Sequence, residues 1–163
     1  MSLAVAVRGV LWTLALPGVV AGYVPWRFFG LRRLRLDLLR PEQAAGALCA
    51  AAGAVALGLC VWAFARQGRG TLAPVDAPRV LVVRGLYRYV RNPMYLAVTA
   101  ILLGEALAAR SAPLLLYWAA WFAGVNVFVI GYEEPSLRRR FGASYRQYAG
   151  RVGRWLPRRG GWT

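Results

Sequence analysis

Four long apolar runs constrain what this chain can fold into more than any other feature. They cover roughly residues 9–29, 42–65, 93–109 and 112–132 of a chain of 163 residues that is 59% hydrophobic. A helix needs about 20 apolar residues to cross the roughly 30 Å hydrocarbon layer of a membrane. Each run approaches that length, and the run at 93–109 is the shortest. The sequence therefore predicts an integral membrane protein.

The runs favour helices over a barrel, because they lack the two-residue alternation of membrane strands. An open sheet would leave backbone groups unpaired in lipid. We predict an all-α integral membrane fold of about four transmembrane helices and a C-terminal amphipathic interfacial helix. Residues 1–163 should form a single membrane domain. It comprises two N-terminal transmembrane helices in 1–65, a cytoplasmic loop in 66–92, and a catalytic helical hairpin with an amphipathic tail in 93–163.

The beginning of the chain resembles a signal peptide only in being apolar. Residues 1–7 carry no basic cluster, and the run that follows is long. A signal peptide has a charged start and a shorter apolar core. We therefore expect the first run to be a retained helix.

The net charge of +15 comes from 21 arginines against six acids. In a soluble protein such a charge indicates nucleic acid binding, but here basic loops beside anionic head groups explain it, and we expect no nucleic acid partner. With four crossings, fifteen arginines lie on the side of the termini and six on the other. The positive-inside rule then places both termini in the cytoplasm, in a plasma membrane of the bacterial type. The basic segment 27–40 is either an outer loop or an interfacial helix.

The second apolar run holds both cysteines and many small residues. Cys49 and Cys60 are eleven residues apart, about 16 Å along a helix, and cannot bond to each other. The small residues at 44–47 and 50–54, with Gly58, predict close packing against another helix. The chain has no histidine and no Cys-x-x-Cys, so we expect no metal site.

A polar stretch precedes the third apolar run. It reads Gly-Leu-Tyr-Arg-Tyr-Val-Arg-Asn-Pro-Met-Tyr over residues 85–95. Asn92 is a favoured N-cap, and Pro93 suits a first helical turn because a proline there loses no hydrogen bond. Tyr87 is expected at the level of the lipid head groups. Taken alone, the stretch predicts a capped helix start with a tyrosine anchor.

Two adjacent carboxylates, Glu133 and Glu134, follow the fourth apolar run. An ionised pair at a membrane boundary is costly unless it is solvated or matched by cations. In the four-crossing topology the pair lies on the same side of the membrane as residues 85–95. The two clusters together predict a polar pocket for a cationic or zwitterionic ligand.

The last part of the chain predicts a basic amphipathic helix in the membrane interface, where it can cover the pocket. Apolar residues recur at helical spacing, while arginines occupy the other faces. Gly142 is expected to divide the segment into two pieces. The stripe consists of Leu137, Phe141, Tyr145, Tyr148, Val152 and Leu156.

These motifs, in this order, resemble the catalytic half of the isoprenylcysteine carboxyl methyltransferase and phospholipid methyltransferase superfamily. The resemblance covers roughly residues 79–157, about half of the chain, and the first two apolar runs match only in hydrophobicity. It rests on Gly85-x-Tyr87-x-x-x-Arg91-Asn92-Pro93-x-Tyr95 and, after a hydrophobic hairpin, on Glu133-Glu134-x-x-Leu137-x-x-x-Phe141-Gly142-x-x-Tyr145.

The resemblance implies S-adenosylmethionine as methyl donor in a cytoplasm-facing pocket, with a lipophilic acceptor that enters from the surrounding membrane lipids. A carboxylate can pair with the ammonium of this donor, and Asn92 with the helix start at Pro93 offers hydrogen bonds to its carboxylate. No catalytic residue is assigned, because methyl transfer chiefly needs in-line positioning in a water-poor site. The positions that align with cofactor contacts are Arg79, Val80, Leu81, Val82, Tyr87, Asn92, Pro93, Met94, Tyr95 and Glu133.

Two departures from the prenylcysteine enzymes concern the acceptor. Asn92 stands where those enzymes commonly have a histidine, although an asparagine can still donate. Val129 stands where they place an arginine that meets the substrate carboxylate. The acceptor therefore stays open among lipid amines, thiols and other lipophilic nucleophiles. The alternatives are an NADPH-dependent membrane reductase of the steroid-reductase type, which has a similar His-Pro-x-Tyr motif, and a non-catalytic membrane protein.

Overall fold

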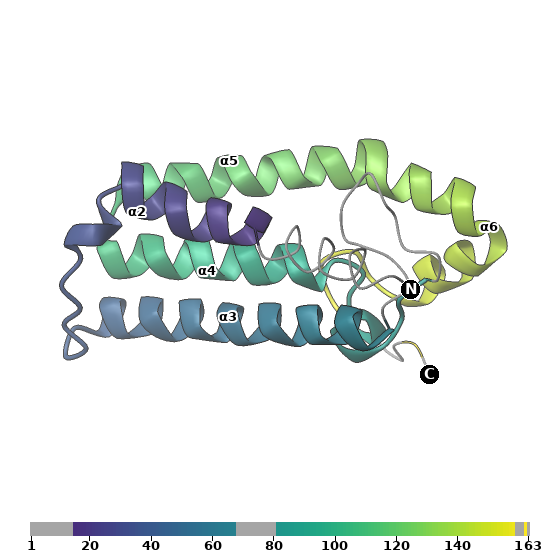
Figure 1. Ribbon diagram of the computed structural model, residues 1–163, viewed down its shortest axis with the longest axis horizontal. Helices are drawn as coiled ribbons and strands as arrows, with labels where there is room; N and C mark the ends of the chain where they lie inside the picture. Colours follow the sequence, from purple (N-terminus) through teal and green to yellow (C-terminus); the bar gives the residue numbers. More distant parts are fainter. Residues whose placement is uncertain (1–14, 68–80, 159–161, 163) are drawn as a thin grey trace.

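Three long helices set the architecture, as Figure 1 shows. They are α3 (Pro41–Gln67), α4 (Pro93–Ala109) and α5 (Ala112–Phe128), and α4 runs antiparallel between the other two. The computed structural model describes residues 15–67, 81–158 and 162, without the side chains of 64–67. These residues form no strand, only an isolated bridge between Val90 and Gly153. The predicted all-α fold is confirmed.

Small residues bring α3 and α4 into close contact, as predicted for the second apolar run, except that Gly58 meets nothing within 4 Å and takes no part in this packing. A Cβ atom added to Gly53 would lie 2.7 Å from the carbonyl oxygen of Ala97, and one added to Gly46 would lie 2.7 Å from the carbonyl oxygen of Gly104. Such distances are too short for a side chain. Backbone approach through glycine is a common basis of helix packing in membranes, where water exclusion contributes little.

The fourth apolar run does not end at the paired glutamates. Helix α5 continues through a π-helical turn, η4 (Val129–Glu133), directly into α6 (Glu134–Arg151). Glu133 and Glu134 therefore lie inside one continuous helical path and not at a helix terminus. Within α6, Gly142 has φ 52° and ψ −120°, so it kinks the helix where the sequence predicted a division. A positive φ is readily accommodated only by glycine.

The N-terminal segment packs on α4 and α5. Residues 15–18 are helical and continue into η1 (Val19–Tyr23) and α2 (Val24–Phe28). The Tyr117 hydroxyl donates to the carbonyl oxygen of Val20 at 3.1 Å, and the Tyr117 ring stacks on Phe29. The basic segment that follows contains only a short 3₁₀ turn, η2 (Leu31–Arg33), and is irregular up to Arg40. It is therefore a loop and not an interfacial helix.

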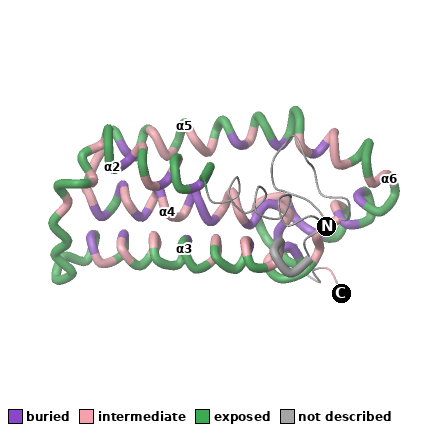
Figure 2. Tube along the Cα trace, viewed as in Figure 1, coloured by how far each residue is buried: buried purple, intermediate pink, exposed green. Residues whose placement is uncertain are grey.

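Two helical stretches of the described chain are long and apolar enough to cross a membrane, Pro41–Ala63 and Ala112–Arg151. Helix α4 is apolar but shorter, with 17 residues. The first run is described only from residue 15, so the number of four crossings stays a prediction. Figure 2 shows α4 as the most buried of the three long helices, while the outer faces of α3 and α5 are exposed. Their exposed side chains include Leu48, Leu116 and Val127, as expected for surfaces that face lipid.

Candidate functional site

The two polar clusters of the sequence meet at one end of the bundle. The Tyr95 hydroxyl, in the first turn of α4, donates to Oε2 of Glu133 at 2.9 Å. Tyr87, from η3 (Gly85–Arg88), is buried beside them and beside Cys60 of α3. Burial raises the pKa of Tyr87, and the nearby groups of Cys60 and Glu133 raise it further. The site thus combines two tyrosines and one carboxylate from three different segments, η3, α4 and η4.

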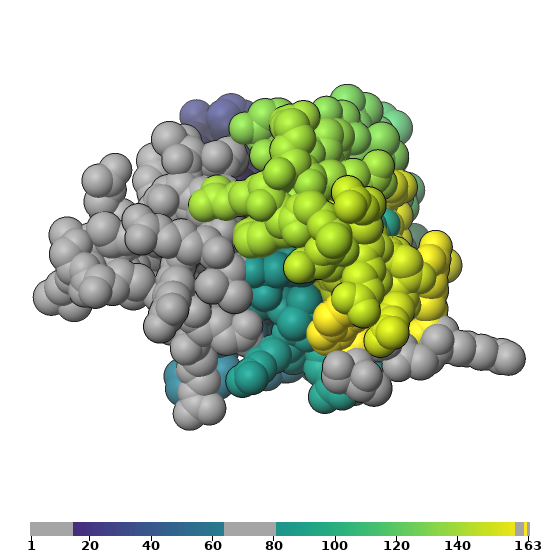
Figure 3. All heavy atoms as spheres, turned by 90° about the vertical axis from the view of Figure 1, so that its right-hand side faces the viewer, coloured from purple at the N-terminus to yellow at the C-terminus, as the bar shows by residue number. Residues whose placement is uncertain are grey.

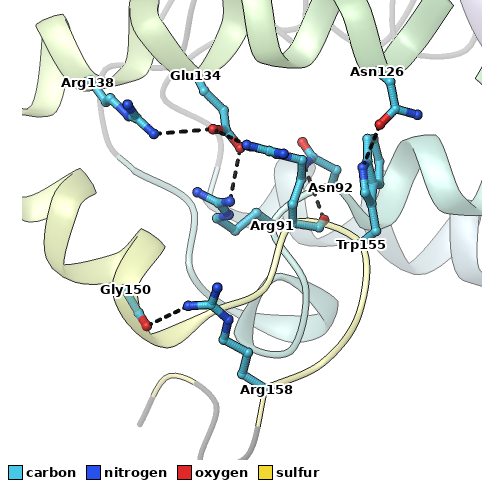
Figure 4. A network of polar contacts seen from close by, with 9 residues as sticks. Arg91, Asn92, Asn126, Glu134, Arg138, Gly150, Trp155 and Arg158 are labelled. Carbon is cyan, nitrogen blue, oxygen red and sulfur yellow. Dashed lines mark hydrogen bonds and ion pairs between the residues drawn. The ribbon is translucent and has the colours of Figure 1, made fainter. Parts of the chain in front are cut away.

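Glu133 and Glu134 have different surroundings although they are neighbours in sequence. The Glu134 side chain, only 4% exposed, meets three arginines in the network of Figure 4. No arginine pairs with Glu133 among the described residues, and its hydrogen-bond partner there is Tyr95. Of the two carboxylates predicted to receive a ligand, only Glu133 therefore remains a candidate. The partners of Glu134 are Arg154 at 2.7 and 2.9 Å, Arg91 at 3.0 Å and Arg138 at 3.5 Å.

Arg91 and Asn92 lie against the C-terminal tail. The backbone N–H of Arg91 donates to the carbonyl oxygen of Gly153 at 2.8 Å, and Nδ2 of Asn92 donates to that of Arg154 at 3.3 Å. Asn92 occupies the N-cap position before Pro93 as predicted, but its side chain makes no capping hydrogen bond. Nε of Arg91 is buried and has no hydrogen-bond partner among the described residues. One donor of this nearly buried guanidinium is therefore unpaired among the described residues.

Arg154 joins the tail to this site. Its hydrogen bonds to Glu134 raise the pKa of its guanidinium. Nε and Nη2 of Arg154 contact the two different carboxylate oxygens, which is the bidentate geometry that fixes both orientation and distance. The tail is thereby fastened beside Arg91.

Most residues of the apolar stripe of the tail pack inside the protein. Tyr145, Tyr148 and Val152 form a buried cluster, with Leu137 and Phe141 packed against it. Segment 81–83 supplies further contacts to this cluster through Leu81 and Val83. Leu156, at the far end of the stripe, is 78% exposed. The tail thus covers the 81–90 segment, and Figure 3 shows α6 beside it at this end of the molecule.

Hydrogen bonds tie the tail to η3. The Tyr148 hydroxyl donates to the carbonyl oxygen of Tyr87 at 2.7 Å. Trp162 donates its backbone N–H to Arg88 at 3.0 Å, and Nε of Arg88 donates back to the carbonyl oxygen of Trp162 at 2.8 Å. These bonds hold the backbone that carries Tyr87, so the tail positions the site.

Asn126 and Trp155 were not predicted. Nε1 of Trp155 donates to Oδ1 of Asn126 at 2.9 Å, and the indole packs 5.5 Å from the Phe122 ring. A polar residue inside an apolar run is a recognisable signal, because such residues usually find a partner within the protein. Asn126 could have been found in this way, whereas no local pattern indicated Trp155.

The other positions predicted to contact the cofactor differ in how far they are buried. Met94 and Val82 are half-buried, and Pro93 is buried at the start of α4. Arg79 and Val80 lie outside the described residues. Val129 is fully buried in η4, so it belongs to the core at the position where prenylcysteine enzymes have their arginine.

A comparison with known families gives a match that spans both polar clusters. The model of the family described as phospholipid methyltransferase matches residues 41–144. The chain belongs to the phospholipid methyltransferase family. No curated protein and no solved structure matches it. The matched range runs from the start of α3 to the kink of α6, and therefore contains Tyr87, Tyr95 and Glu133.

Membership in the phospholipid methyltransferase family defines the general activity. The protein is a membrane methyltransferase of a family that acts on lipids. The apolar helices described above agree with a place in the membrane.

Proposed function

We propose that the protein transfers a methyl group from S-adenosylmethionine to a lipophilic acceptor, at the end of the bundle where Tyr87, Tyr95 and Glu133 meet. The observation that carries this proposal is the carboxylate of Glu133. It is half-buried, accepts a hydrogen bond from Tyr95 and pairs with no arginine in the part of the chain that the structure describes, whereas its neighbour Glu134 pairs with three. A carboxylate with spare acceptor capacity fits the ammonium group of the methyl donor.

The residues present also fit the carboxylate of that donor. Helix α4 begins at Pro93, and the free N–H groups of a helix start attract anions. Arg91 lies next to this start with its unpaired Nε. Glu133 would therefore hold the positive end of the amino acid portion, and the start of α4 with Arg91 the negative end. Segment 79–82 and Met94 are proposed to complete the cofactor contacts.

S-adenosylmethionine supplies an electrophilic methyl group on a sulfonium when bound. The residues around it then need to orient the acceptor in line and to exclude water. Tyr87 is buried and rigidly held through its carbonyl oxygen by Tyr148, which suits it for walling the pocket. We assign no general base.

The acceptor is proposed to enter from the bilayer between the helices. Val129 gives the site no cation for a prenylcysteine carboxylate, so the acceptor is a lipid amine, a thiol or another lipophilic nucleophile. We propose that the site and both termini face the cytoplasm, in a membrane of the bacterial type, because arginines are in excess on the side of residues 66–92 and of the tail.

Binding in detergent tests the proposal. The purified protein should bind S-adenosylmethionine or its demethylated product, and Glu133→Gln should weaken binding by roughly tenfold or more, the effect of losing a charged hydrogen bond. Glu42→Gln, which removes an exposed carboxylate at the other end of the bundle, is the matched control and should bind as the wild type does. Binding of NADPH without either ligand would favour the reductase. Absence of all nucleotide binding would favour a non-catalytic protein.

The acceptor can be identified directly. Labelled S-adenosylmethionine is supplied with a total lipid extract, and the lipid species that gains the label is isolated. Transfer to water-soluble molecules only would contradict a lipophilic acceptor.

A further inference from the structure

A carboxylic acid lies within the bundle at the opposite end of α4 from the candidate site. Glu105 is twelve residues beyond Pro93, about 18 Å along the helix axis. Its Oε2 atom is buried and has no hydrogen-bond partner among the described residues. Arg110, nearby in sequence, instead pairs with Glu42 at 3.6 Å. Ionisable residues inside membrane helices are costly and usually functional.

The face of α4 that carries Glu105 packs against α5 and the N-terminal segment. Val98, Leu102 and Glu105 are separated by four and three residues, so they share one face of α4. Val98 and Leu102 are buried together with Ala21. Tyr117 lies within electrostatic range of Glu105. The α5 side chains packed against the cluster are Tyr117, Trp118 and Trp121.

Two more buried polar atoms without partners belong to this interface. They are the Nε1 atoms of Trp118 and Trp121, for which the described residues supply no acceptor. Helices α4 and α5 are antiparallel and joined by two residues, so Glu105 and Trp118 differ in level by only about 3 Å. Side chains on a helix lean toward its N-terminus. In this antiparallel pair the carboxyl group and the indoles therefore lean toward each other.

The three atoms define what chemistry they can bind. A carboxylate oxygen accepts hydrogen bonds, whereas an indole N–H only donates. A hydroxyl group does both, so a single hydroxyl can donate to Glu105 and accept from an indole. An ammonium group would leave the indoles unpaired, and a phosphate would be repelled by the carboxylate. Glu105 as a whole keeps partial exposure, so a ligand can reach this interface from the side of the bundle.

We propose that the interface of α4 and α5 around Glu105, Trp118 and Trp121 binds the hydroxyl group of a lipophilic alcohol or phenol. This ligand enters from the membrane at the end of the bundle away from the methyl-transfer site. The proposal depends on the three unpaired atoms and not on the proposed function.

Photolabelling tests this site. A long-chain alkanol that carries a diazirine is compared with the matching alkane diazirine on the full chain in detergent, and labelled peptides are mapped by mass spectrometry. The alkanol should label the peptides of α4 and α5 in preference to the alkane. Glu105→Leu should reduce alkanol labelling roughly tenfold, because the charged acceptor is lost. Glu105→Gln should reduce it less, since its amide oxygen still accepts.

The control variant is Glu42→Leu, which removes a carboxylate at the same end of the bundle and should leave the labelling unchanged. Glu105→Leu replaces an unpaired buried acid by an apolar side chain and should fold, as an unfolding temperature checks. If it does not fold, the smaller reduction in Glu105→Gln decides. Equal labelling by alkanol and alkane, or full alkanol labelling of folded Glu105→Leu, would refute the proposal. Binding of S-adenosylmethionine, measured separately on each variant, should be retained.

Discussion

Replacing Glu134 by glutamine tests whether one buried carboxylate fastens three segments together. The substitution keeps the shape of the side chain but removes the charge that faces Arg91, Arg138 and Arg154. Glu134 is 4% exposed and Arg91 is 10% exposed, so their pair is largely removed from water. Removing one partner of a buried ion pair costs about 3–5 kcal/mol, because the other charge remains buried without compensation.

The three arginines should differ in importance according to their exposure. Arg91 is 10%, Arg154 31% and Arg138 57% exposed. Arg138 also sits four residues after Glu134 on the same helix, where exposed pairs contribute about 0.3–0.5 kcal/mol. Arg91→Gln should therefore be the most destabilising of the three arginine variants, Arg154→Gln intermediate, and Arg138→Gln nearly neutral.

Thermal unfolding in detergent, followed by tryptophan fluorescence, measures these differences. For a chain of this length, 1 kcal/mol shifts the midpoint by about 2–4 °C. Glu134→Gln should then lower the midpoint by roughly 6–20 °C. Arg138→Gln should lower it by less than about 2 °C. The double variant Glu134→Gln with Arg154→Gln should lose less than the sum of the single losses, because the two residues share one interaction.

Two results would refute this reasoning. If Arg138→Gln destabilises the protein as much as Arg154→Gln, burial does not set the strength of the network. If Glu134→Gln unfolds at the temperature of the wild type, the carboxylate does not fasten the tail.

Two further predictions follow from packing. A Cβ atom at Gly104 would collide with the backbone of α3, so Gly104→Ala should destabilise the protein by about 1–3 kcal/mol. A Cβ atom at Gly58 would meet nothing within 4 Å, so Gly58→Ala should be neutral or stabilising. Chemical unfolding of the two variants measures the difference. Trp155→Phe removes the hydrogen bond to Asn126 but keeps the ring beside Phe122, and should cost about 1 kcal/mol in the same assay. Equal losses in Gly104→Ala and Gly58→Ala would contradict the packing argument.

The helices follow from local patterns. The start of α3 at Pro41 and the bounds of α4 at Pro93 and Ala109 agree with the apolar runs, since proline at a first turn and long apolar stretches act locally. The continuity of α5 with α6 was missed. The glutamates after the apolar run predicted a helix end, whereas residues 129–133 form a π-helical turn that continues the helix.

The meeting of the two polar clusters at one end of the bundle was predictable from the sequence, but the different surroundings of the two glutamates were not. The order of Tyr87, Tyr95 and Glu133 along the chain indicated that they gather at one end, and they do. The residue pattern by itself predicted a pocket at the Glu133-Glu134 pair, and only the family resemblance singled out Glu133. Their difference depends on which arginines lie within reach, and Arg154 is twenty residues away from Glu134 in the chain.

The sequence by itself determined that the protein lies in a membrane, that its fold is helical and which segments carry the polar motifs. Hydrophobicity, turn preferences and motif order are local features that can be recognised in the sequence. Only the tertiary structure decided which charges are paired. A carboxylate's partners are set by distances of about 3 Å across segments, which no local pattern encodes. For that reason Glu134 emerged as a structural anchor, Glu133 as the available carboxylate, and Glu105 as an acid with an unpaired oxygen.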